Sequence, residues 1–181
     1  EIKKSMNIGE ISKQKVPDGI DPIDYLFQRQ MNLMIKYEMP EVDLDVPNDQ
    51  GLLRQFAWNT VEELSEVLDV VHTTQNREHI IDEISDATHF YIELFLLSGL
   101  HSEDFKQAMV PIQTLMASSL REIHSEFIEK LALAINVLKN RQWRKTNLLT
   151  NKDLYYFKLK ETIPLFMYFI GKLELSFEEW I

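Results

Sequence analysis

Apolar residues recur along most of this 181-residue chain at the three- and four-residue spacing of buried helix faces. Residues 77–99 are apolar on nearly every side after the first turn, which is typical of a helix buried in a core. The pattern predicts helices over 22–38, 51–74, 77–99, from 102 towards 111, over 118–140 and over 152–171, with a short segment after 176. The sequence therefore predicts an all-α helical bundle.

Capping and breaking residues predict where these helices begin and end. Asp21 followed by Pro22 indicates an N-cap with proline at the first helical position. Pro47 and its polar neighbours predict a turn before the helix over 51–74. Ser102 is expected to cap the fourth helix, and Pro111 to kink or end it.

The second half of the chain resembles the first. Residues 61–71 match 128–138 in their apolar positions, and residues 80–105 match 155–180 as a long apolar helix, a break and an acidic turn. In this alignment Lys130, Leu133, Lys158 and Glu161 stand where the first half has Glu63, Glu66, Glu83 and Asp86. We therefore expect a mobile lead-in over 1–20 and one domain over 21–181, with an acidic half over about 51–110 and a degenerate duplicate over about 118–181.

Composition narrows the range of partners. The net charge of −10 argues against a nucleic-acid polymer, which requires a basic footprint. No apolar run approaches the roughly 18 residues of a membrane span, so we expect no membrane partner. The chain has no cysteine, which excludes thiolate sites and fits a cytoplasmic protein.

Four carboxylates form two i,i+3 pairs on consecutive helices: Glu63 with Glu66, and Glu83 with Asp86. Residues three apart lie on one helix face, so antiparallel packing would bring all four together. Such pairs often mark only a solvated face, but the second pair lies on the most apolar helix, where charges are costly unless paired or metal-bound. Cysteine is absent and histidine is sparse near these acids, so the hard cation Mg²⁺ is the expected ligand, with two or more ions.

Taken together, Glu62-Glu63-x-x-Glu66 and Glu83-x-x-Asp86 resemble the signature of the all-α NTP pyrophosphatases, a superfamily that includes MazG-type proteins. Asp86-x-x-His89-Phe90, together with Leu26, Gln30 and Leu33, resembles the branch of dimeric dUTPases and phage dCTP/dUTP pyrophosphatases. The resemblance implies a Mg²⁺-dependent hydrolase that splits a deoxynucleoside triphosphate, most simply dUTP, into the monophosphate and pyrophosphate. It also implies a homodimer in the cytoplasm, or in the host cytoplasm if the chain is phage-encoded.

The resemblance assigns roles residue by residue. It implies that Glu63, Glu66, Glu83 and Asp86 bind the metal, with Glu63 or Glu66 also orienting or deprotonating the attacking water. Gln30 would contact the base, and His89 and Phe90 would line the nucleoside pocket. Each has an ordinary alternative: an interhelical glutamine, a core histidine and a core phenylalanine.

The chain departs from that branch at its cationic elements. The connection over 72–79 lacks a tryptophan–lysine element, and a similar segment, Asn140 to Lys145, occurs in the second half instead. This segment either receives phosphates or is an exposed basic loop with one packed tryptophan. Two other functions are therefore considered: a dCTP-specific or broad MazG-like hydrolase, and a catalytically eroded helical interaction module.

Overall fold

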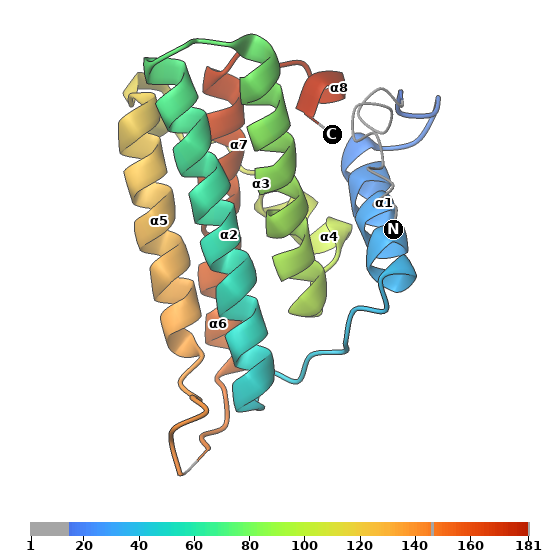
Figure 1. Ribbon diagram of the computed structural model, residues 1–181, viewed down its shortest axis with the longest axis vertical. Coiled ribbons are helices and arrows are strands. Elements are labelled where there is room, and N and C mark those ends of the chain that lie inside the picture. Colours follow the sequence, from blue (N-terminus) through green and yellow to red (C-terminus); the bar gives the residue numbers. More distant parts are fainter. Residues whose placement is uncertain (1–14, 146, 181) are drawn as a thin grey trace, which may run out of the picture.

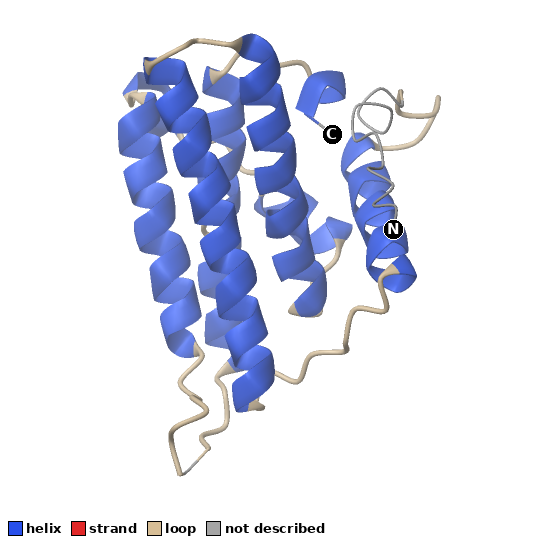
Figure 2. Ribbon diagram, in the orientation of Figure 1, coloured by secondary structure: helices blue, strands red, loops and turns tan. Residues whose placement is uncertain are grey.

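The computed structural model describes residues 15–145 and 147–180, and within these ranges it is all-helical, with no strand. The fold class predicted from the sequence is thus confirmed. Figure 1 shows the long helices standing side by side as a bundle, and Figure 2 shows that loops alone connect them. The elements are α1 (Pro22–Lys36), α2 (Pro47–His72), α3 (Arg77–Leu97), α4 (Ser102–Ala108), the 3₁₀ helix η2 (Gln113–Ala117), α5 (Leu120–Val137), α6 (Lys152–Lys160), α7 (Ile163–Lys172) and α8 (Phe177–Trp180).

Two predicted helix starts are wrong by a few residues. Helix α2 begins at Pro47, because proline is well suited to the first turn, where its missing N–H leaves no bond unmade. Ser102 is the first residue of α4 rather than its cap. The N–H of the preceding His101 donates instead to Asp104 Oδ2, at 3.1 Å.

The single helix expected over 152–171 is also wrong, because the structure breaks it into α6 and α7. Pro164 lies in the first turn of α7, and it cannot donate the bond that a continuous helix would need there. Thr162, at the break, donates its hydroxyl to Leu159 O at 2.6 Å. The break falls where the second half aligns with Asp86 of α3.

The two halves pack on each other reciprocally. Helix α4 contacts α6 and α7, while α8, its counterpart in the second half, contacts α3. Tyr91 of α3 and Phe166 of α7 occupy aligned positions, and their rings lie 4.3 Å apart at the centre of the bundle. Phe95, Phe105 and Phe127 complete this aromatic core. The helices that carry the acids and those that carry their counterparts therefore share one core.

Outside the bundle, α1 packs against α3 and α4. Residues 1–14, and with them most of the expected lead-in, lie outside the described residues, whereas Val16 packs against the core. No helix in the described part of the chain is long and apolar enough to cross a membrane.

Candidate metal centre

The acidic pairs lie on the two helices α2 and α3, which pack antiparallel along most of their length. Buried residues such as Leu64, Val67 and Ile84 fill the contact between them. The connection is short: Gln75 takes a positive φ of 54°, and the Asn76 side chain accepts hydrogen bonds from the backbone N–H groups of Glu78 and His79 in the first turn of α3. This tight reversal sets the register in which the acids of α2 face those of α3.

Three of the four predicted carboxylates meet. Oxygens of Glu63, Glu83 and Asp86 all lie within 4.8 Å of one another, the spacing at which one cation could bind all three. Glu63 and Glu83 are half-buried, and Asp86 is exposed. Glu66 is exposed and is not part of this close group, although it shares a face of α2 with Glu63. We call Glu63, Glu83 and Asp86 the acidic triad.

Packing the three carboxylates of the acidic triad together is electrostatically unfavourable. Burial first, then a hydrogen bond to Glu83 and the charges of Asp86, Glu83 and Glu66, together raise the pKa of Glu63 to about 7. Burial also raises the pKa of Asp86, with the charges of Glu83 and Asp82 adding to the effect. Carboxylates at this distance cannot all remain ionised without taking up a proton or a cation.

Sequence reasoning missed one neighbour of the acidic triad. His79 Nε2 lies 2.7 Å from Glu83 Oε1, so a histidine does contact the acids. The i,i+4 spacing of these two residues on α3 could have revealed the pair. Because His79 is exposed, its ring can swing away when Glu83 engages a cation.

The predicted base-contacting residues form a second polar group, between α1 and α3. Gln30 is 1 % exposed, and its Oε1 accepts a hydrogen bond from His89 Nδ1 at 2.6 Å. Burial lowers the pKa of His89, as does the charge of Arg29, so the ring is neutral. Gln30 Nε2 is buried and makes no hydrogen bond of ordinary geometry among the described residues, which is costly for a polar group in a core. The Glu93 carboxyl is the acceptor that the amide nitrogen approaches, and their interaction is strong enough to lower the pKa of Glu93.

Glu93 lies one turn beyond His89 on α3 and was not predicted as a site residue. Burial raises its pKa, a hydrogen bond from the Gln30 side chain offsets part of that rise, and the net result is a pKa of about 7. The i,i+4 spacing from His89 on a mostly apolar helix was the available signal. Phe90 has a different environment: it is half-buried, and its ring lies 6.1 Å from that of Phe56. Its observed contact is therefore a packing contact between α3 and α2.

The aligned positions of the second half carry an ion pair. Lys130 Nζ lies 3.2 Å from Glu161 Oε1, at the positions that align with Glu63 and Asp86. Leu133, aligned with Glu66, is an exposed apolar side chain. Of the four positions that align with the predicted carboxylates, only Glu161 is acidic, and the ammonium group of Lys130 neutralises it.

The basic segment from Asn140 to Lys145 does not lie beside the acidic triad of the same chain. The backbone N–H of Asn140 donates to the Gln50 side chain near the start of α2, and Glu63 follows thirteen residues later, a rise of about 20 Å. Trp143 is 78 % exposed, so the expectation of a packed tryptophan is wrong.

A surface groove of about 460 Å³ lies elsewhere, between the segment after α4 and helix α7. Its walls are mostly apolar, from Met109, Pro111, Pro164 and Met167, and none of the predicted site residues lines it. Comparison with known proteins adds nothing to this geometry, because no family model, no curated protein and no solved structure matches the chain.

Proposed function

We propose that the protein is a Mg²⁺-dependent nucleotide pyrophosphohydrolase that converts dUTP to dUMP and pyrophosphate, and that it acts as a cytoplasmic homodimer. The observation that carries this proposal is the convergence of Glu63, Glu83 and Asp86 from two helices onto one point. The spacing of the same residues in the sequence is what resembles the pyrophosphatase signature, so pattern and geometry point to the same function.

The residues of the acidic triad fit Mg²⁺ by their chemistry. All three offer carboxylate oxygen, the ligand type that this cation prefers, and Mg²⁺ commonly completes its shell with water and substrate phosphates. A bound cation would also relieve the repulsion that raises the pKa of Glu63. When bound, Mg²⁺ supplies charge neutralisation for the phosphate oxygens and lowers the pKa of a coordinated water.

The proposed reaction is an in-line displacement at the α-phosphorus. The oxygen of a water molecule bonds to that phosphorus, the bond to the oxygen bridging the α- and β-phosphates breaks, and pyrophosphate leaves. The proton of the water passes to a carboxylate acting as general base. Glu66 suits this role best, because it shares a face of α2 with Glu63 yet stands outside the acidic triad.

The group around Gln30 supplies the matching polar surface for a base. Gln30 Nε2, which makes no hydrogen bond of ordinary geometry among the described residues, can donate to a carbonyl oxygen, of which uracil has two. His89 holds the Gln30 amide in that orientation by donating to its oxygen. Glu93, with its pKa near 7, can accept a hydrogen bond from an imide N–H when it is ionised. These three side chains are the basis for preferring a pyrimidine.

The test is pyrophosphate release by the full-length protein from dUTP, dCTP, dTTP and dATP, and phosphate release from dUDP, with Mg²⁺ and with EDTA. A strong preference for dUTP would support the proposal, and a preference for dCTP would move it within the same branch. Broad activity would favour a MazG-like hydrolase. Silence with every nucleotide, in a folded protein, would refute the enzyme and leave the interaction module.

Two variants separate the roles of the acids. Glu66→Gln should abolish turnover while the helical circular dichroism spectrum and Mg²⁺ binding persist, because the residue lies outside the acidic triad. Glu62→Gln is the matched control: it removes an adjacent exposed carboxylate and should leave turnover unchanged. Full activity in Glu66→Gln would exclude this residue as the base.

A further inference from the structure

The loop between α5 and α6 presents an unusual set of side chains. Arg144 N–H donates to Arg141 O at 3.0 Å, which closes a turn with Trp143 near its apex. Trp143 is 78 % exposed, Leu148 54 % and Leu149 90 %. Arg144 and Lys145 are exposed beside them. We call Trp143, Arg144, Lys145, Leu148 and Leu149 the tip surface.

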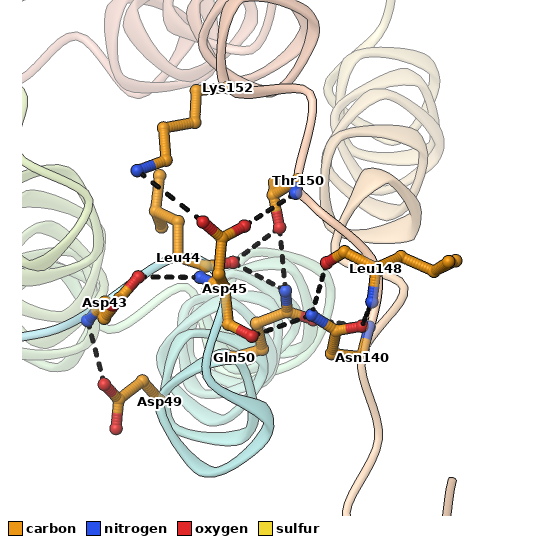
Figure 3. Close-up of polar contacts among 9 residues, drawn as sticks. All are labelled: Asp43, Leu44, Asp45, Asp49, Gln50, Asn140, Leu148, Thr150 and Lys152. Atoms are coloured by element: carbon orange, nitrogen blue, oxygen red, sulfur yellow. Dashed lines mark hydrogen bonds and ion pairs between the residues drawn. The ribbon is translucent and has the colours of Figure 1, made fainter. Parts of the chain in front are cut away.

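A network of buried hydrogen bonds holds the base of this loop, as Figure 3 shows. The Asn140 side chain donates to Asp45 O and Leu148 O, each at 2.8 Å, and accepts from Leu148 N at 2.7 Å. Gln50 Nε2 donates to Leu44 O and to Thr150 Oγ1, at 2.6 and 3.0 Å. Both ends of the loop are thereby fixed to the start of α2. These hydrogen bonds fix both ends of the loop, so its tip is held away from the core. The apolar side chains at the tip therefore stay exposed.

The loop is also locally basic in an acidic protein. Residues 138–152 contain Lys139, Arg141, Arg144, Lys145 and Lys152 and no acidic residue, whereas the whole chain carries a net charge of −10. Arg141 bonds to the carbonyl oxygens of Leu138 and Asn140. Lys152 lies 3.9 Å from Asp45. Among the described residues no ion pair involves Arg144 or Lys145. These two charges are free to meet an anionic partner.

We propose that the tip surface docks on an anionic lipid membrane surface. Figure 1 shows that the loop extends past the ends of the helices at one end of the long axis, so its tip can reach a flat surface before the helices do. A bilayer interface supplies both things that these side chains lack: anionic headgroups for Arg144 and Lys145, and an apolar layer for Trp143 and Leu149. Indole rings are enriched at that interface.

Two other anionic partners fit less well. A single-stranded nucleic acid would stack on Trp143 but would leave Leu148 and Leu149 in water. A second copy of the chain would have to offer acidic and apolar side chains together on one surface, and self-association is one of the outcomes that the test below separates. Peripheral contact of this kind needs no membrane-spanning helix. It replaces the expectation that no membrane is a partner.

The experiment is co-sedimentation of the full chain with vesicles of phosphatidylglycerol and phosphatidylcholine, and with vesicles of phosphatidylcholine alone. Binding to the anionic vesicles alone, reversed by high salt, is expected. Arg144→Gln/Lys145→Gln should weaken partitioning about 25-fold, at about fivefold for each cation. Trp143→Ala/Leu149→Ala should weaken it about tenfold at low salt, because the apolar anchor is lost.

A matched control removes the same charge elsewhere. Arg121 and Lys172 lie on α5 and α7 outside the loop, so Arg121→Gln/Lys172→Gln should weaken partitioning much less than the loop variant. In a Trp58→Phe background, Trp143 is the exposed indole, and its fluorescence should shift to shorter wavelength on anionic vesicles.

Three results would overturn the proposal. The first is equal partitioning into both kinds of vesicle, and the second is binding that neither loop variant weakens. The third is a different partner: retention of a single-stranded oligonucleotide, or self-association in sedimentation velocity, abolished by Arg144→Gln/Lys145→Gln while vesicle binding is absent.

Discussion

Replacing Glu63 with glutamine should make the metal-free protein more stable at alkaline pH. The pKa of Glu63 rises from 4.5 to about 7 because the folded protein buries it among other acids. Its neutral form is therefore favoured by folding. The stability that this provides is complete below pH 4.5 and is lost as the pH rises through about 7, where Glu63 ionises in the folded protein. Glutamine keeps the side chain neutral throughout.

The magnitude follows from the size of that rise. A change from 4.5 to about 7 corresponds to at most about 3 kcal/mol. Glu63 is only half-buried, so solvent screening reduces the effect to about 1–2 kcal/mol. For a domain of this length, that is a gain of about 3–6 °C in Tm for Glu63→Gln at pH 8. Glu93 also has a raised pKa, but it is present in both proteins and cancels from the difference.

The assay is thermal unfolding followed by circular dichroism, at pH 5 and pH 8, with EDTA and then with Mg²⁺. Most of the difference between Glu63→Gln and the parent should disappear at pH 5. Mg²⁺ at ten times its Kd should stabilise the parent by about 1.4 kcal/mol and the variant much less. Glu62→Gln, an adjacent exposed position, should change neither curve.

The reasoning would be refuted if Glu63→Gln melted at or below the parent temperature at pH 8. It would also be refuted if Glu62→Gln gave the same gain, because the effect would then reflect the overall negative charge rather than the acidic triad. An unchanged response to Mg²⁺ in Glu63→Gln would exclude this residue as a ligand.

Three further predictions test other parts of the structure. Gln30→Met should lower Tm by about 3–6 °C, because His89 loses its buried acceptor at a cost of about 1–2 kcal/mol. The same variant should raise the KM for dUTP with little change in kcat, and an unchanged KM would exclude Gln30 from the base subsite. Asn140→Ala should lower Tm by about 6–12 °C, since three hydrogen bonds at the loop base are lost, whereas the exposed Asn147→Ala should melt like the parent. Lys130→Glu should lower Tm by about 2–4 °C through repulsion with Glu161. The double variant Lys130→Glu/Glu161→Lys should recover most of that loss in Tm. If the losses in the double variant were additive instead, the pair would contribute no attraction.

The helices were predictable because their cause is local. An apolar residue every three or four positions can be buried only if that segment is helical, so the pattern along the chain predicts both the class and the approximate extent of each helix. The larger errors fall at prolines, whereas the start of α4 at Ser102 is misplaced by one residue. Pro47 begins α2 and Pro164 lies at the start of α7, because a first turn accepts proline. The apolar pattern around a proline does not show whether the residue ends one helix or begins the next.

The identity of the candidate ligands was likewise available from spacing, but their arrangement was not. The i,i+3 rule places Glu63 and Glu66 on one face of α2, yet only Glu63 reaches the acids of α3. The register between α2 and α3 decides this, and the turn at Gln75 and the packing of side chains such as Ile84 set that register. Contacts of this kind join residues from different helices, and no local pattern contains them.

The sequence by itself determined an all-helical chain with paired acids, since both follow from the spacing of residues within single helices. The tertiary structure alone decided which charges meet. It brought Glu63, Glu83 and Asp86 together, joined Lys130 to Glu161 in the second half, and buried the Gln30 side chain against His89. Those outcomes depend on how whole helices pack, because Coulomb energies and desolvation costs are fixed by distances across the bundle and not by distances along the chain.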